Sequence, residues 1–146
     1  MRVRLHIDER YEEPEIVICA AARTPDVLRL KETVEGAMAA TVTGYSEGEA
    51  HALRCADVVR FYAEQDRVYA QCGNASFMLR EKLYELEARL DPALFVRISR
   101  FEIVNLRRIV KLDTRLTGTI RVLLEGGAQA YVSRRNVTRI KRMLGI

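Results

Sequence analysis

The sequence is poor in cysteine and histidine. Its three cysteines, Cys19, Cys55 and Cys72, are widely spaced and form no C-x-x-C pair, and its only histidines are His6 and His51. Protein zinc sites combine Cys and His ligands at characteristic spacings, so we expect no metal site. The cysteines are predicted to be reduced thiols that pack as small hydrophobic side chains.

Groupings typical of catalysis are also missing. The sequence has no glycine-rich phosphate loop, no G-x-S-x-G motif and no cysteine paired with a histidine at a recognisable spacing. His6 and His51 both fall on expected strands, where an ordinary surface or edge position is a simpler interpretation than a general base. We therefore predict no catalytic residue, no cofactor and a protein that is not an enzyme.

Long apolar segments are absent as well. No run approaches the roughly 20 residues that a membrane-spanning helix needs. The start, Met1–His6, lacks the apolar core and cleavage site of a signal peptide, so a cytoplasmic location is expected. With 146 residues and 49% hydrophobic side chains, the chain can bury a core, and one domain with or without a small appendage is expected.

Tryptophan does not occur, and aromatic residues make up 7% of the chain without interleaving its basic segment. Proteins that bind single-stranded nucleic acid stack the bases on aromatic side chains. This composition therefore weighs against single-strand binding.

Positive charge, by contrast, is concentrated in the last third of the chain. Residues 97–146 hold twelve Lys or Arg against three acids, a net charge of +9 in a chain whose total is +4, whereas residues 1–50 carry a net charge of −4. A face that binds a polyanion explains this segregation, with nucleic acid as the leading candidate. A basic face that is merely solvated is the alternative that charge alone leaves open.

The first 45 residues are predicted to form a small β-β-α arm. Arg2–Ile7 alternates polar and apolar residues, as half-buried strands do, and Glu15–Ala20 has the composition of a more buried strand. Thr24-Pro25-Asp26 is a favourable helix start, because Thr can cap, Pro suits the first turn and Asp complements the helix dipole. Apolar residues then recur at helical spacing to about Ala40. The arm (residues 1–45) can pack on the main domain or pair with a second copy, as a dimerisation or regulatory element.

Residues 46–146 are predicted to form the main domain, mostly β with helical additions (an α+β fold). Gly73-Asn74 is a strong hairpin signal, and leucines at helical spacing predict a helix over Arg80–Leu90. A last helix is expected from Asn136. The expected strands are 50–54, 58–63, 67–72, 75–79, a short strand ending near Arg97, 109–112, 119–124 and 128–132.

Several basic residues fall where the chain changes direction. Arg97 and Arg100 lie around the end of a short expected strand, and Ser133-Arg134-Arg135-Asn136 joins an expected hairpin to the last helix. Loop positions let long side chains project from a rigid scaffold. Arg can donate two hydrogen bonds to guanine, Asn can do the same for adenine, and Ser suits phosphate. Arg139 and its basic neighbours on the last helix are expected to contribute through charge alone.

Two stretches together resemble the LytTR DNA-binding domain of bacterial transcription regulators. They are Phe95-Val96-Arg97-Ile98 followed by Ile103-Val104-Asn105-Leu106, and Val132-Ser133-Arg134-Arg135-Asn136 at the end of a hairpin. The match runs from about His51 to Ile146. The resemblance implies an elongated, mostly β fold that contacts duplex DNA through loops rather than through a recognition helix. Asn105 occupies a hallmark position of the family, and we expect it to be structural, holding its own loop in place.

The resemblance also implies which residues contact DNA. The positions used by the family match Arg67 or its neighbours, Arg100, and the segment 133–136. Ser99-Arg100-Phe101 stands where the family commonly has His followed by Lys/Arg-Ser, so the positive charge is retained. Together with the charged positions found above, the predicted DNA-binding residues are Arg67, Arg97, Arg100, Ser133, Arg134, Arg135, Asn136 and Arg139.

The partners implied by the resemblance are macromolecules. The family typically binds direct-repeat promoter sites in double-stranded DNA, so a homodimer, or pairwise binding on DNA, is expected. Residues 1–45 are far too short for the receiver domain that many relatives carry. The chain is therefore similar to stand-alone regulators, some of which are controlled by a small membrane protein. A protein-interaction module whose basic face binds an acidic protein or a membrane surface is the alternative function.

Overall fold

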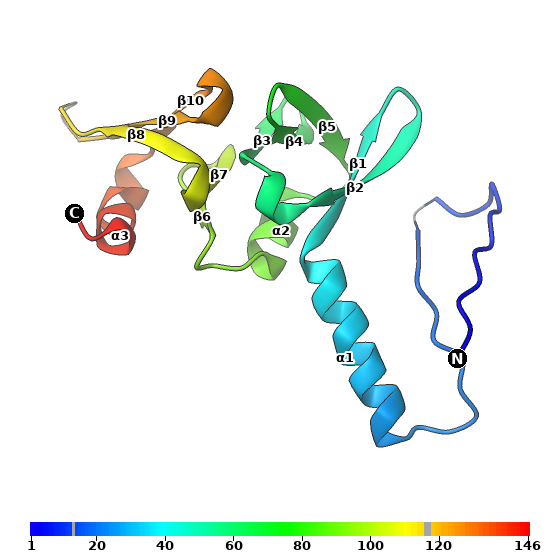
Figure 1. The fold of residues 1–146 in the computed structure, drawn as a ribbon. Helices are drawn as coiled ribbons and strands as arrows, with labels where there is room; N and C mark the ends of the chain where they lie inside the picture. The colour runs from blue at the N-terminus through cyan, green and yellow to red at the C-terminus, as the bar shows by residue number, and fades with distance from the viewer. Residues whose placement is uncertain (13, 116–117) are drawn as a thin grey trace. The chain divides into compact units, whose positions relative to one another are not determined.

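The computed structural model describes residues 1–12, 14–115 and 118–146. They form two compact units, Met1–Glu35 and Gly36–Ile146 (Figure 1). The first unit consists of an extended segment and most of helix α1 (Pro25–Ala39). Thr24 Oγ1 accepts a hydrogen bond from the Val27 amide at 3.3 Å, so the helix start predicted at Thr24 is confirmed.

The two strands predicted in the arm, at 2–7 and 15–20, are wrong. The described residues before α1 form no strand, and their apolar side chains are exposed, with Val3 97% and Leu5 87% accessible. The backbone instead makes a turn in which the Tyr11 amide donates to the Asp8 carbonyl at 3.1 Å. Alternation is an insufficient signal here, because a strand also needs a neighbour that bonds its backbone and an apolar surface that covers its side chains.

The second unit contains a seven-stranded antiparallel sheet with the strand order β2-β1-β5-β4-β3-β7-β6 (Figure 1). One face of the sheet shares a hydrophobic core with helix α2 (Leu83–Arg89), in which Phe61, Leu86 and Ile103 are buried. The strands are β1 (Thr41–Ser46), β2 (Glu49–Arg54), β3 (Arg60–Glu64), β4 (Arg67–Cys72), β5 (Ala75–Leu79), β6 (Phe95–Arg97) and β7 (Glu102–Asn105).

Tight turns connect the hairpins of this sheet. Glu47-Gly48 joins β1 to β2 with φ angles of 51° and 78°, and Gln65-Asp66 joins β3 to β4 with φ angles of 49° and 63°. Turns with two positive φ angles match the twist of the strands that they join. Gly73-Asn74 joins β4 to β5, as predicted. Because β1 pairs with β2 along its whole length, the structure places residues 41–45 in the sheet, whereas the predicted boundary assigned them to the arm.

Helix α2 is shorter than the helix predicted over Arg80–Leu90. Leu79 ends β5, where it pairs with Val68, and the helix begins only at Leu83. The Lys82 amide donates to Glu85 Oε1 at 3.2 Å, which caps the first turn. The leucine stripe is nevertheless buried as predicted, at Leu79, Leu83, Leu86 and Leu90.

A second, three-stranded antiparallel sheet has the order β10-β9-β8. It shares a second core with helix α3 (Arg134–Leu144), where Ile120 and Ile140 are buried. Ser133 precedes the helix, and Gly145 ends it with a φ angle of 70°. The segment 133–136, predicted as a loop, is therefore the N-cap and first turn of α3. The strands are β8 (Ile109–Asp113), β9 (Ile120–Leu124) and β10 (Gln129–Val132).

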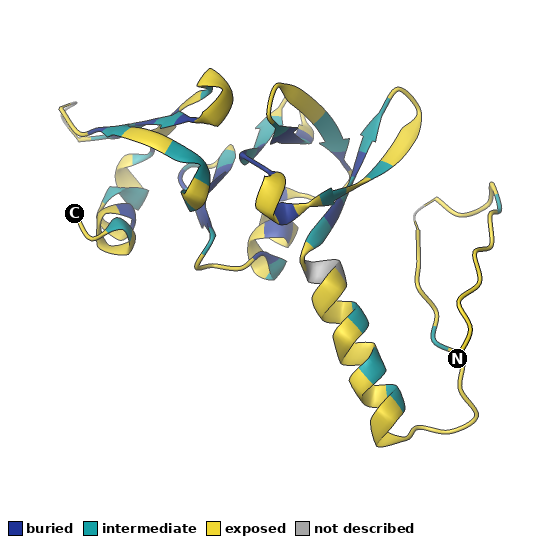
Figure 2. Cartoon of the chain, viewed as in Figure 1, coloured by how far each residue is buried: buried dark blue, intermediate teal, exposed yellow. Residues whose placement is uncertain are grey.

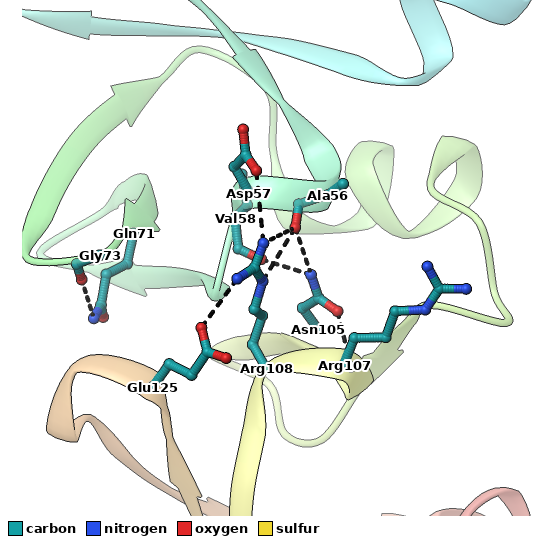
Figure 3. Close-up of polar contacts among 9 residues, drawn as sticks. All are labelled: Ala56, Asp57, Val58, Gln71, Gly73, Asn105, Arg107, Arg108 and Glu125. Carbon is teal, nitrogen blue, oxygen red and sulfur yellow. Dashed lines mark hydrogen bonds and ion pairs between the residues drawn. The ribbon is translucent and has the colours of Figure 1, made fainter.

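Asn105 connects the end of β7 to the segment before β3 (Figure 3). Its side chain is fully buried; Nδ2 donates to the Val58 carbonyl at 2.9 Å, and Oδ1 accepts from the Arg107 amide at 3.0 Å. The second bond holds the 3₁₀ turn η2 (Leu106–Arg108) that follows β7. The structural role predicted for Asn105 is confirmed.

Arg108 links the two sheets (Figure 3). Its guanidinium donates to the Ala56 carbonyl at 2.8 Å, in the 3₁₀ turn η1 (Cys55–Asp57), and to Glu125 Oε2 at 3.1 Å, in the turn η3 (Glu125–Gly127). Within η3, Gly126 has a φ angle of 81°, and a Cβ there would lie 3.1 Å from the Gly73 carbonyl oxygen. Glycine is thus required both by the backbone conformation and by the close approach of the two turns.

Most residues of the first unit are exposed, whereas many strand residues of the second unit are buried (Figure 2). The three cysteines differ in burial as well. Cys55 is buried and Cys72 half-buried, and burial raises the pKa of both thiols. Cys19 is exposed, so the prediction that all three pack as hydrophobic side chains is wrong for this residue. Over the described residues, no group of three or more His, Cys, Asp or Glu side chains could hold a metal ion. Nor is any helix in these parts of the chain long and apolar enough to cross a membrane.

Candidate nucleic-acid interface

The loop between β6 and β7 is held by Arg97. Its guanidinium donates to the Ser99 carbonyl at 2.7 Å, to the Arg100 carbonyl at 2.9 Å and to Glu87 Oε2 on α2 at 2.9 Å. The Phe101 amide donates to Ser99 Oγ at 3.1 Å. The backbone at Arg100 is therefore fixed, while the Arg100 side chain is exposed.

The start of α3 is attached to the same loop. The Ser133 amide donates to the Ile98 carbonyl at 2.8 Å. Asn136 Nδ2 donates to Ser133 Oγ at 2.7 Å, which links the first turn of α3 to the residue before it. Arg135 follows Ser133 in the first helical turn and is exposed. The hydrogen bond from Ser133 to Ile98 thus links the helix that carries Arg135 to the loop that carries Arg100, and so sets the relative positions of the two arginines.

A shallow depression of about 460 Å³ lies between α2, this loop and the start of α3. Its charge is predominantly positive, since four arginines and one acid line it. A concave basic surface attracts polyanions more strongly than isolated charges do. The lining residues are Glu87, Arg97, Ser99, Arg100, Arg135, Asn136 and Arg139.

The four arginines of the depression are held to different degrees. Arg97 has 20% of its side chain accessible and donates to three acceptors. Arg139 donates from Nη2 to the Arg97 carbonyl at 3.1 Å, which ties α3 to the end of β6. Arg100 and Arg135 are exposed, and Arg100 lies 5.7 Å from the centre of the Phe101 ring. These last two side chains are the best placed to reach a ligand.

Three predicted residues, Arg67, Ser133 and Arg134, do not line the depression. Arg67 follows the β3–β4 turn, and its Nη1 lies 4.0 Å from the sulfur of Met78 on β5. Arg134 is exposed and turned toward Gly118, where a Cβ would lie 3.6 Å from its Nε. The structure therefore brings five of the eight predicted residues to the depression, and Ser133 precedes the helix that carries three of them.

Part of the basic charge in the last third is used inside the fold. Arg115 and Arg121 both donate to Asp113 Oδ2 at 2.9 Å. The hydrogen bonds from Arg115 hold the pKa of the Asp113 carboxyl well below its ordinary value. With Arg108 bound to Glu125, these pairs occupy three of the twelve basic side chains in residues 97–146.

Glu87 and Ser99 line the depression but are not among the predicted DNA-binding residues, and Glu87 is the one acid among the lining residues. On the sequence it is one of several acidic residues on the polar side of α2, and no spacing distinguishes it. Its contact with Arg97 joins α2 to the last residue of β6, ten residues further along the chain, and only the fold brings the two together.

Known proteins resemble this chain in both sequence and fold. The model of the LytTr DNA-binding domain matches residues 48–145. An uncharacterized HTH-type transcriptional regulator of Staphylococcus aureus (strain NCTC 8325 / PS 47) is 35% identical over 147 residues, which cover 100% of this chain and 99% of that protein. Another, from strain N315, is 41% identical over 106 residues, covering 73% of this chain and 71% of that protein.

The fold has a solved counterpart in a LytTr DNA-binding domain from Bacillus cereus. The two structures agree with a TM-score of 0.70 at 20% sequence identity, over 73% of this chain and 98% of that one. The fold class predicted from the sequence, mostly β with added helices, is confirmed. Although the Staphylococcus relatives are named as HTH-type, the helices in the described parts of this chain are separated by strands. The chain belongs to the LytTR DNA-binding domain family.

Proposed function

We propose that this protein is a transcription regulator that binds specific sequences in duplex DNA through the depression beside α3. One observation carries the proposal: Arg100 and Arg135, from two different elements, are both exposed at one basic depression whose backbone is fixed by hydrogen bonds. The family, and the regulator names of the Staphylococcus relatives, support a role in transcription.

The chemistry of the two arginines suits base recognition. A guanidinium can donate two parallel hydrogen bonds to guanine in the major groove, and such contacts are most selective when the side chain starts from a rigid position. The β6–β7 loop and the first turn of α3 give Arg100 and Arg135 such positions. Arg139 and the exposed Lys141 and Arg142 on α3 add attraction for phosphates without sequence preference.

Helix α3 is proposed to support this surface rather than to enter a groove as a recognition helix. Ile140 is buried in the second core, and Val137 and Leu144 pack against it. One side of the helix is therefore occupied by the protein itself. Its first turn, with Arg135, remains exposed.

We further propose that two copies bind together on direct-repeat sites, and that the first unit contributes to the pairing. The exposed apolar side chains Val3, Leu5, Ile16 and Val17 support this role, because soluble chains seldom leave such segments uncovered. Sedimentation of the full chain and of residues 36–146 tests it. The full chain is expected to dimerise and the shorter chain to remain monomeric; equal masses would contradict a role for the arm.

The binding site is tested by selecting bound sequences from a random duplex pool and then measuring affinity by fluorescence anisotropy. Arg100→Ala and Arg135→Ala should each weaken binding to the selected duplex by about 1–3 kcal/mol, the contribution of one base contact. Arg54→Ala is the matched control, since Arg54 is an exposed arginine on β2. Unchanged affinity in both test variants would contradict the site. Equal, weak affinity for all duplexes with tight binding to an acidic polypeptide would instead favour a protein-interaction module.

A further inference from the structure

We infer that Arg97 is a positioning residue: held by Glu87, it fixes the β6–β7 loop so that Arg100 and Arg135 are presented together, and it does not itself contact DNA. The inference deepens the proposed function and rests on it. It also revises the prediction from charge, which had counted Arg97 among the contacting residues.

The contacts of Arg97 leave little of its guanidinium for a ligand. Nε, Nη1 and Nη2 each have a partner within 2.9 Å, respectively the Ser99 carbonyl, Glu87 Oε2 and the Arg100 carbonyl. Only 20% of the side chain is accessible. A phosphate or base edge could bind Arg97 only by displacing acceptors that the fold already supplies.

The same contacts explain what Arg97 does. Two successive carbonyls of a short loop point to one guanidinium, whose planar fork imposes a fixed geometry on both. The Arg97 carbonyl in turn accepts from Arg139 on α3. The adjacent Ile98 carbonyl accepts from Ser133, the residue before α3. Arg97 therefore stands where α2, the loop carrying Arg100 and the helix carrying Arg135 meet.

Glu87 provides the sharpest test. A role through charge alone and a role in positioning Arg97 predict opposite changes in affinity for the selected duplex when Glu87 is replaced. It is an acid in a basic depression, with 44% of its side chain accessible. If it acted through charge alone, Glu87→Gln would strengthen binding to any duplex, since a repulsive charge is removed. If it positions Arg97, Glu87→Gln should raise affinity for a scrambled duplex but lower affinity for the selected one, so that the specificity ratio falls.

Arg97→Lys keeps the positive charge but removes the planar guanidinium that donates to three acceptors at once. We expect affinity for the selected duplex to fall roughly tenfold or more, comparable to loss of one base contact. The dependence of affinity on salt should remain unchanged, because no phosphate contact is lost. Arg54→Lys on β2 is the control for the substitution itself, and thermal unfolding establishes that each variant is folded. An unchanged affinity for the selected duplex would overturn the inference.

Hydrogen exchange without DNA separates this inference from the proposed function. In Arg97→Lys and Glu87→Gln, the amides of Phe101 and Ser133 should exchange faster than in the wild type, since both donate within the assembly that Arg97 holds. Unchanged exchange in both variants would contradict the positioning role even if the protein binds DNA as proposed. If the wild type selects no duplex, the proposed function fails, whereas faster exchange still supports Arg97 as the residue that holds the loop.

Discussion

Two arginine-rich regions of the second unit differ in what their side chains contact. At the depression, Arg100 and Arg135 are exposed on a backbone fixed by other residues. At the junction between the sheets, Arg108 donates to Ala56 and Glu125 and is occupied by the fold. The difference shows that the number of arginines in a segment is an upper limit on the number that a ligand can contact. Hydrogen-bond partners decide which arginines can bind it.

The largest expected effect lies at the junction. Asn105→Ala should lower the free energy of unfolding by about 3 kcal/mol, because it leaves the Val58 carbonyl and the Arg107 amide without their partner and opens a cavity. Chemical denaturation measures the change. Asn136→Ala, which removes the side-chain bond to Ser133 at the start of α3, is the matched comparison and should cost about 1 kcal/mol. Equal losses in the free energy of unfolding would mean that Asn105 stabilises the fold no more than Asn136 does.

Much of this arrangement could be predicted from local sequence, and the reasons are physical. Gly73-Asn74 marks a hairpin because turn geometry depends on adjacent residues. Leu83 and Leu86 mark a buried helix face because a helix brings them together wherever it packs. Arg2–Ile7 also has strand alternation, but a strand depends on a partner that no local pattern supplies, and the prediction there is wrong.

The candidate site was less predictable. Arg100 and Arg135 were identified by charge, position and family resemblance, and the structure places both at one depression. The role of Arg97 could not be inferred, because its three acceptors come from a loop and from α2, which meet only in the folded protein. Ser133 is a residue type that commonly precedes a helix, so the start of α3 at Arg134 could have been predicted two residues earlier than Asn136.

A smaller effect is expected at acid pH. The folded protein holds the pKa of Asp113 below its unfolded value of about 4, so Asp113 stabilises the fold above that pH and the contribution is lost as the pH falls below it. The melting temperature of the wild type should therefore drop more between about pH 5 and pH 3 than that of Asp113→Asn. Parallel curves for the two proteins would show that the pairs with Arg115 and Arg121 contribute no pH-dependent stability.

The central claim is tested most directly by one paired measurement on the selected duplex. Affinity and melting temperature are determined for Arg135→Ala and Arg108→Ala side by side. Arg135→Ala should lose roughly 5- to 150-fold in affinity, the equivalent of one base contact, and keep its melting temperature. Arg108→Ala should melt at a lower temperature but, once folded, bind nearly as the wild type does. Equal losses of affinity in the two variants, or wild-type binding by Arg135→Ala, would contradict the division between arginines that contact DNA and arginines that hold the fold.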